Sequence, residues 1–379
     1  MFKTIAQRAS LLIFAVALVL PAGFGQAAQA PTLDAAKKQA IVDEISTLLN
    51  KNYVFAETAA KMEERVRGRL KNGDYDKYAG VAEFAQAVSQ DLLAVSKDRH
   101  LGFAYNPGAA ENIRRLNSQS EEEARKARER QLQGLRRNNF GFRKVERLDG
   151  NIGYLDFRMF AAPDQAGPTA IAAMNFLAYC DAIIVDLRQN GGGDPAQIQL
   201  ISTYFFDEPV HLNDLYARAA DRTENYWTLP YVPGPKAVGA DLYILTSART
   251  FSGAEEFTYN MKNLKRATVI GETTGGGAHP TGARIVQHDF ILRVPFARAI
   301  NPISKTNWEG TGVTPDIQVP AADAFDRAYA MAVEKLAGKA TDPQRKAEYE
   351  WILAGEKAKQ NPPQVDEKTL NSYAGVYGE

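Results

Sequence analysis

Hydrophobic positions recur every three or four residues in three stretches between residues 32 and 95. The first stripe contains Ile41, Ile45, Leu48 and Leu49, the second Ala59, Met62, Val66 and Leu70, and the third Val81, Phe84, Val88, Leu92 and Leu93. A polar break at residues 73–76 separates the second stripe from the third. This period is typical of amphipathic helices that bury one face. We therefore predict a small three-helix bundle at the N-terminus.

A strongly charged segment follows the bundle. Ser120 precedes Glu123 in the spacing of a capping box, which predicts a helix start. The residues after it are charged nearly all round, with acids and bases alternating. Such a pattern favours a solvated helix that links two domains. We assign residues 31–137 to an N-terminal helical domain that ends in this linker.

Short apolar runs replace the long helical stripes from residue 138 onward. Two short strands are expected within residues 140–157, around an Asp149-Gly150 turn. Continuous apolar runs at 182–187, 242–245 and 267–270 predict strands buried on both faces, with helical patterns at 169–179 and 198–206. This alternation indicates an α/β (α+β) core. The core is assigned to residues 138–340, and residues 341–379 are read as a C-terminal tail.

The first thirty residues have the pattern of a secretory signal peptide. Lys3 and Arg8 precede an apolar run of ten residues, 11–20, and small residues follow at 25–30. The run is too short to span a bilayer as a mature helix, although an uncleaved anchor is the alternative. We expect an exported protein, periplasmic or extracellular, with no stable membrane span once the signal peptide is removed.

Composition excludes several classes of protein. The 45 basic and 45 acidic residues cancel, so nothing indicates a nucleic-acid partner. The single cysteine, Cys180, rules out an intramolecular disulfide. The chain has no histidine pair at i, i+4 and no cysteine pair, so nothing indicates a metal site. We also expect no cofactor. The sequence carries no indication of the oligomeric state.

Ser252 occupies the most informative position in the chain. The apolar strand 242–245 runs into a polar turn, and Ser252-Gly253 opens a helical pattern. A hydroxyl at a helix N-terminus lies beside unpaired N–H groups that carry partial positive charge. This arrangement suits a nucleophile with an adjacent oxyanion site. The alternative is that Ser252 only caps the helix.

Four further segments offer partners for such a serine. His100 lies where a helical pattern gives way to a strand, and His279, in the glycine-rich turn 275–280, is the rival base. Glu309 could orient a histidine as a triad acid does. Gly191–Gly193 end a buried strand, so their N–H groups could hold an oxyanion or a substrate strand, unless the segment is only a tight turn.

The segments KDRHLGF, IIVDLRQNGGGD, LTSARTFSGAEEF, GETTGGGAHP and NWEGTGVTPDIQVP occur in this order between residues 97 and 320. Together they resemble the tail-specific, or C-terminal processing, serine peptidase family. The closest branch is similar to interphotoreceptor retinoid-binding protein repeats and to the tricorn peptidase core. The resemblance covers roughly residues 32–340 and implies a crotonase-like (ClpP/crotonase) core with an N-terminal three-helix bundle.

The resemblance also implies roles for single residues. Ser252 becomes the nucleophile, His100 the general base and Glu309 the acid that orients the base. The oxyanion hole would be formed by the N–H groups of Gly253, Gly191 and Gly192, and Gly193 would contact substrate. The implied activity is that of a serine endopeptidase, which hydrolyses protein or peptide substrates through an acyl-enzyme. A non-catalytic binder of apolar ligands and a small-substrate esterase or amidase are the alternatives.

The sequence departs from the better-known bacterial members of this family in two ways. Those members use a Ser–Lys dyad, whereas the matching region here is glycine-rich, and Lys262 and Lys265 lie on the presumed nucleophile helix. No PDZ-like segment lies between the bundle and the core. We therefore prefer a histidine base and expect Arg222, Arg298 and His279 to contribute to substrate binding, the arginines through a terminal carboxylate.

Overall fold

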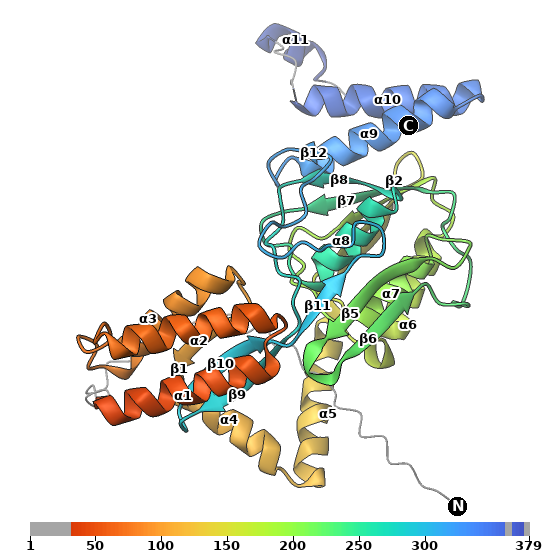
Figure 1. Cartoon of the computed structure of the whole chain (residues 1–379). Coiled ribbons are helices and arrows are strands. Elements are labelled where there is room, and N and C mark those ends of the chain that lie inside the picture. The colour runs from red at the N-terminus through yellow and green to blue at the C-terminus, as the bar shows by residue number, and fades with distance from the viewer. Residues whose placement is uncertain (1–31, 361–365, 375–379) are drawn as a thin grey trace, which may run out of the picture.

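A computed structural model describes residues 32–360 and 366–374, so the predicted signal peptide, residues 1–30, lies outside the described residues. These residues form an N-terminal module, an α/β core and a pair of helices beyond the core (Figure 1). In this part of the chain, no helix combines the length and apolar character needed to cross a membrane.

The N-terminal module contains the three predicted helices and a small sheet that the sequence pattern did not reveal. The helices are α1 (Ala35–Asn52), α2 (Ala56–Lys71) and α3 (Val81–Ser96). Strand β1 (Gly102–Tyr105) pairs with β10 (Phe290–Pro295), which pairs in turn with β9 (Thr281–Val286). Val286, Phe290, Leu292 and Val294 join the apolar cluster of the helices. The predicted bundle is therefore completed by strands from far along the chain.

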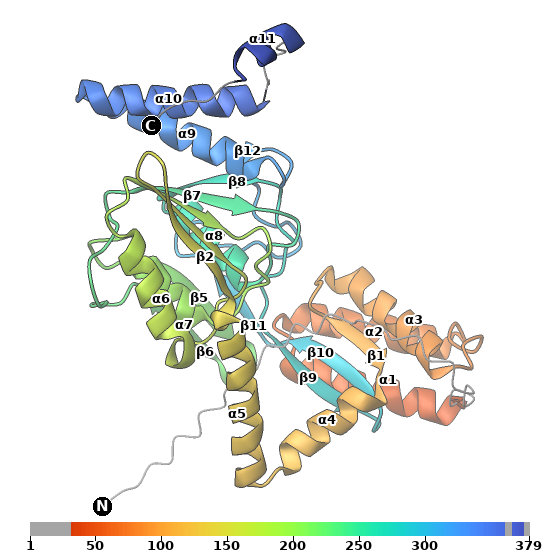
Figure 2. The same cartoon turned by 180° about the vertical axis from the view of Figure 1, so that it is seen from behind.

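Two helices form an arm between the module and the core. Helix α4 (Pro107–Ser118) leads away from the module, and α5 (Glu121–Arg137) returns toward the core (Figure 2). The Ser120–Glu123 capping box is present and α5 buries no residue, as predicted for a solvated linker helix. A short 3₁₀ turn, Asn139–Gly141, then enters the core.

The core is a six-stranded sheet in the order β12-β8-β7-β4-β3-β2. Only β2 is antiparallel to its neighbour. The strands are β2 (Phe142–Leu148), β3 (Ile152–Phe157), β4 (Ala182–Asp186), β7 (Asp241–Thr246), β8 (Ala267–Gly271) and β12 (Ile317–Gln318). Every residue of β4 is buried, as expected for a strand covered on both faces. The mixed α/β class predicted from the sequence is confirmed.

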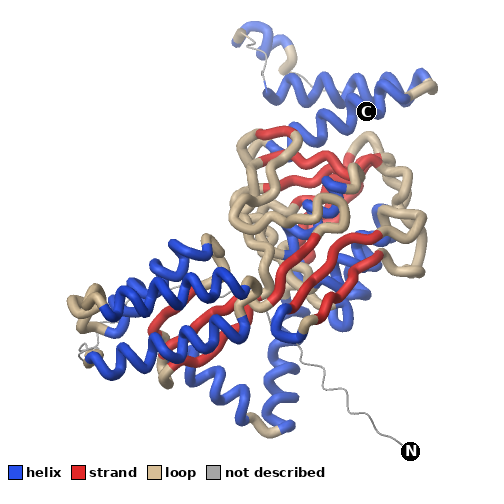
Figure 3. Tube along the Cα trace, viewed as in Figure 1, coloured by secondary structure: helices blue, strands red, loops and turns tan. Residues whose placement is uncertain are grey.

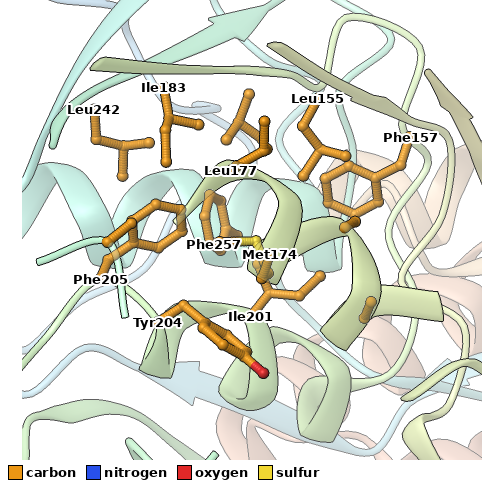
Figure 4. Packing of buried hydrophobic residues seen from close by; sticks show 14 of the residues in the cluster. Leu155, Phe157, Met174, Leu177, Ile183, Ile201, Tyr204, Phe205, Leu242 and Phe257 are labelled. Atoms are coloured by element: carbon orange, nitrogen blue, oxygen red, sulfur yellow. The ribbon is translucent and has the colours of Figure 1, made fainter. Parts of the chain in front are cut away.

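Alternate residues of the core strands face two separate helical layers. Ile183 and Leu242 pack with α6 (Pro163–Leu177), α7 (Pro195–Thr203) and α8 (Gly253–Asn263), through side chains such as Met174 and Phe257 (Figure 4). Ile184 and Tyr243 pack on the other face, against α9 (Ala324–Lys339). Because alternate strand residues point to opposite faces of the sheet, one of these faces packs against α8. Ser252, at the N-cap of α8, is positioned by this packing.

A second antiparallel sheet of three strands lies beside the core, in the order β11-β5-β6. Its strands are β5 (His211–Ala217), β6 (Arg222–Trp227) and β11 (Ala297–Ile300), with a 3₁₀ turn, Arg218–Ala220, between β5 and β6. Figure 3 shows loops on both flanks of the core, many of them on the side that faces the N-terminal module. The segment predicted as a tail contains two helices, α10 (Pro343–Gln360) and α11 (Glu367–Ser372). Tyr349 of α10 is buried against residues of α9.

Candidate active site

Ser252 lies at the N-cap of α8, in the loop that follows β7. Its backbone has φ 54° and ψ −121°, a conformation that costs a non-glycine residue on the order of 1–3 kcal/mol. The Ser252 N–H donates to Oε2 of Glu255 at 2.8 Å, which holds the strained turn from the first turn of the helix. The N-cap position predicted from the sequence is confirmed, with a strain that a simple cap does not require.

The glycine loop after β4 packs its backbone directly against this serine. A methyl group on Gly192, which has φ 100°, would lie 2.5 Å from the Gly253 nitrogen and 2.9 Å from Cβ of Ser252. A methyl group on Gly253 would lie 2.9 Å from the Gly193 nitrogen. Only glycines allow the two backbone segments to approach so closely.

Two of the predicted oxyanion donors are already engaged within the protein. The Gly191 N–H donates to the Arg158 carbonyl at 3.3 Å, and the Gly192 N–H donates to Oδ1 of Asn190 at 2.8 Å. Among the hydrogen bonds of the described residues, none uses the N–H of Gly193 or of Gly253. The N–H groups left available to an oxyanion are thus those of Gly193 and Gly253, whereas those of Gly191 and Gly192 are engaged.

His100 and Glu309 meet at the edge of the site. His100 lies in the loop between α3 and β1, with its ring 5.0 Å from that of Phe251, the neighbour of Ser252. Its Nδ1 is 3.5 Å from Oε2 of Glu309. Both Nδ1 of His100 and Oε1 of Glu309 are buried without a hydrogen-bond partner.

No hydrogen bond joins Ser252 to His100 within the described part of the chain. Hydrogen bonds of catalytic groups are often long in the absence of substrate and shorten when it binds. The structure therefore places His100 against Glu309 and against Phe251, the residue before Ser252, without a hydrogen bond between serine and histidine.

His279, the rival base in the glycine-rich turn, is buried and paired with an aspartate. Its side chain is 4% exposed, and its Nδ1 lies 2.7 Å from Oδ2 of Asp98, which is 1% exposed. Burial on its own would raise the pKa of Asp98, but the hydrogen bond from His279 and the nearby imidazoles hold that pKa below its ordinary value. The ionised Asp98 also accepts a hydrogen bond from the Tyr53 hydroxyl at 3.2 Å.

Glu309 is held in place by the glycine-rich turn. Its Oε2 accepts hydrogen bonds from the N–H groups of Ala278 at 2.6 Å and His279 at 3.2 Å. Asp98, His279 and Glu309 present potential metal-ligand atoms within 4.8 Å of one another. Oδ2 of Asp98 and Oε2 of Glu309 already accept hydrogen bonds within the protein, whereas Oε1 of Glu309 has no hydrogen-bond partner.

Sequence reasoning missed Glu255, whose carboxylate binds backbone N–H groups of the glycine-rich turn. Its completely buried carboxylate accepts hydrogen bonds from the N–H groups of Ser252, Gly276 and Gly277 at 2.7–2.9 Å, and the Thr274 hydroxyl donates to it at 2.5 Å. Burial raises the pKa of Glu255, and these hydrogen bonds oppose the shift. The signal for it was present, because Ser252 and Glu255 have the Ser-x-x-Glu spacing of a capping box.

The two arginines predicted to bind substrate occupy different environments. Arg298 lines a cavity of about 490 Å³ together with Lys97, Lys305 and Glu309. Its guanidinium lies over the ring of Phe55 at 5.1 Å, and its Nε is buried without a partner. Arg222 lies on β6, where it is 69% exposed and forms an ion pair with Glu224, and it is not part of this cavity. Neither Ser252 nor His100 lines the cavity, which therefore adjoins the acid rather than the serine.

The lysines of the helix that follows Ser252 lie away from the serine. Lys262, in the last turn of α8, donates to the Thr314 carbonyl at 2.7 Å and to Asp316 at 2.6 Å. Lys265 follows the helix. Since Ser252 is at the opposite end of α8, neither lysine can act as its base.

Comparisons with known proteins give matches to both the N-terminal module and the core of this chain. The model of peptidase family S41 matches residues 151–319, and that of the N-terminal domain of this family in eukaryotic interphotoreceptor retinoid-binding protein matches residues 26–133. Among solved structures, a candidate peptidase from Parabacteroides merdae superposes with a TM-score of 0.55 at 16% identity, over 78% of this chain and 96% of that one. At this identity the superposition shows a shared fold.

Two further solved structures are more distant. The photosystem II D1 C-terminal processing protease has a TM-score of 0.48 at 14% identity, over 75% of this chain and 93% of that chain. The tricorn protease has a TM-score of 0.46 at 14% identity, over 85% of this chain and 37% of that chain. The two family models together cover the N-terminal module and the core that jointly build the site. The chain therefore belongs to peptidase family S41, a family of serine peptidases.

Proposed function

We propose that this peptidase cleaves its substrates through an acyl-enzyme formed on Ser252, with His100 as general base and Glu309 as the acid that orients His100. The observation that carries the proposal is the convergence of these three residues from distant segments. Nδ1 of His100 faces Glu309 at 3.5 Å, and the ring of His100 contacts the residue next to Ser252. Protein or peptide substrates follow from the family.

The geometry supports the following sequence of steps. Nε2 of His100 takes the proton of the Ser252 hydroxyl as Oγ forms a bond to the substrate carbonyl carbon. The oxyanion accepts hydrogen bonds from the N–H groups of Gly193 and Gly253. His100 then gives its proton to the leaving amine as the C–N bond breaks. Water attacks the acyl-enzyme by the same route, which releases the carboxylic acid and restores the serine.

Covalent labelling with a fluorophosphonate tests the nucleophile directly. We expect wild-type protein to be labelled at Ser252, as mapped by mass spectrometry, and Ser252→Ala not to be labelled. His100→Ala should lower the labelling rate by roughly a thousandfold or more, and Glu309→Gln by about ten- to a thousandfold, because a misoriented base still retains part of its effect.

The matched control is His211→Ala, because His211 also pairs with an aspartate, Asp214, at 2.7 Å but lies on β5. This variant should label at the wild-type rate. A Ser252→Ala protein that retains full peptidase activity would contradict the proposal, as would a folded wild-type protein that neither labels nor cleaves peptides.

We also propose that Arg298, rather than Arg222, binds an anionic group of the substrate, such as a terminal carboxylate. The support is its position in a cavity that two lysines also line, with a buried Nε that has no partner. Arg298→Ala should raise KM for peptides with a free carboxylate by about tenfold and leave KM for amidated peptides unchanged. Arg222→Ala is the control, and equal effects on both classes of peptide would count against the role.

A further inference from the structure

His279 and Asp98 form a buried pair next to Glu309, with Nδ1 of His279 3.6 Å from Oε2 of Glu309. This pair has no part in the proposed catalytic steps. His279 and Asp98 are 4% and 1% exposed, and Nδ1 of His279 donates to Asp98 at 2.7 Å. The ring of Phe55 covers His279 at 5.6 Å. Burying a charged group is costly unless it is paired and hydrogen-bonded, so the pair requires an explanation beyond the packing of a turn.

The pair closes a ring of contacts that contains both the base and its acid. Oδ1 of Asp98 accepts a hydrogen bond from the backbone N–H of His100 at 2.9 Å, and Oδ2 accepts one from His279. The backbone N–H of His279 donates to Oε2 of Glu309 at 3.2 Å. Nδ1 of His100 faces that same oxygen at 3.5 Å. Asp98 thus fixes the main chain of the base, while His279 fixes the side chain of the acid.

His279 also contacts two carboxylates, that of Asp98, which is buried, and that of Glu309, which is 12% exposed. Its Nδ1 lies 2.7 Å from Oδ2 of Asp98 and 3.6 Å from Oε2 of Glu309. The Asp98 and Glu309 oxygens are within 4.8 Å of each other. Two carboxylates at such a separation repel each other, and a donor that contacts both offsets this repulsion.

We infer that His279, together with Asp98, is a positioning residue that keeps the carboxylate of Glu309 aimed at His100. This inference rests on the proposed function, in which Glu309 orients the base. It gives a role to the histidine that the sequence offered as a rival base and as a substrate contact. Because His279 acts through Glu309, its loss should affect the chemical step and leave substrate binding unchanged.

Substitutions that differ only in where they place a donor test this role. Asparagine places its amide N–H₂ near the position of the histidine Nδ1, whereas glutamine places it near Nε2. We expect His279→Ala and His279→Gln to lower kcat by about ten- to a hundredfold with KM within about twofold of wild type. His279→Asn should recover kcat to within a few-fold. His211→Asn, in a histidine–aspartate pair on β5, should change neither constant.

A double-variant comparison distinguishes a positioning role from a structural one. In a Glu309→Gln background there is no second charge to separate, so His279→Ala should cost at most about twofold in kcat. Additive losses would overturn the inference. So would a His279→Asn protein as slow as His279→Gln, which remains a usable result if His279→Ala fails to fold.

A spectroscopic measurement on Ser252→Ala protein keeps the test independent of activity. Ring ¹⁵N shifts report which nitrogen of a histidine carries the proton. We expect His100 to be protonated at Nδ1, toward Glu309, and this tautomer to be lost or reduced in Ser252→Ala/His279→Gln but retained in Ser252→Ala/His211→Asn. An unchanged His100 tautomer would overturn the inference even if the wild-type protein proves inactive, which is the separate outcome that would contradict the proposed function.

Discussion

Glu256 is a buried acid on α8 that takes no part in the proposed catalytic steps. It is 6% exposed. Burial raises its pKa to about 7, the nearby charge of Asp194 adds to the shift, and the Asn213 side chain opposes it. The folded protein therefore binds a proton here between about pH 4.5 and pH 7 that the unfolded chain does not bind. Stability should fall as the pH rises through this window.

Replacing Glu256 by glutamine should remove that pH dependence. Above about pH 7 the wild-type protein must bury a carboxylate, which costs on the order of 3 kcal/mol for a shift of this size. We expect Glu256→Gln to be more stable than wild type by up to this amount at about pH 8, and by little or nothing at about pH 5. Urea unfolding at the two pH values measures the difference.

Glu334→Gln on α9 is the control, because Glu334 is exposed. An equal change in stability at both pH values for Glu256→Gln would show that Glu256 does not titrate in this window.

The sequence identified the residues that lie in motifs and missed those defined by long-range pairing. Ser252 was predicted because a strand, a turn and a helical stripe are local patterns. Asp98 lies two residues before His100, yet its partner, His279, is 181 positions away in the chain. Likewise, nothing local reveals that Asn190 uses the Gly192 N–H and leaves the Gly193 N–H free. Which donors remain available is a property of the folded loop.

At the scale of elements, the strongly periodic segments were predicted and the tertiary partners were not. The helices of the N-terminal module and the buried strands β4, β7 and β8 follow from repeating apolar positions. The sequence pattern did not indicate that β9 and β10 leave the core to complete the module. Helix α10 lies in the segment read as a C-terminal tail, where Tyr349 and Ile352, which pack against α9, are few among charged neighbours.

The position of α8 shows how the elements cooperate at the site. Phe257 and Met261 anchor the helix in the core, and Glu255 in its first turn holds the Ser252 N–H and the turn that carries Gly276. The same helix therefore buries an apolar face and directs its N-terminal N–H groups toward the serine. Strain at Ser252 persists because both ends of the turn are fixed.

At the scale of the whole molecule, the site lies where the N-terminal module meets the core. His100 and Asp98 come from the module, whereas Ser252 and Glu309 come from the core. The separation of the base from the nucleophile therefore depends on how the two parts are held together. Arg99, from the loop that carries His100, donates to the Gly275 carbonyl of the core at 2.9 Å and is one such link.

Arg218 forms a second link across this junction. From the 3₁₀ turn after β5 it donates to the carbonyls of Tyr53 at 2.7 Å and Asn50 at 2.6 Å, where a cation also complements the C-terminal end of α1. Arg218→Ala should let the module tilt relative to the core and lower the rate of Ser252 labelling about three- to tenfold, which corresponds to about 1 kcal/mol. Arg222→Ala, a nearby exposed arginine on β6, should not change that rate.

The labelling measurement must be made well below the unfolding temperature, so that loss of folded protein does not imitate misalignment. Hydrogen exchange should then show faster exchange at the C-terminal end of α1 and in the loop that carries His100, with the core sheet unchanged. An Arg218→Ala protein with a lower unfolding temperature but a wild-type labelling rate would mean that Arg218 stabilises the fold without aligning the catalytic groups. In that case the alignment must depend on Arg99 and on the β9–β10 strands, which physically continue from the core into the module.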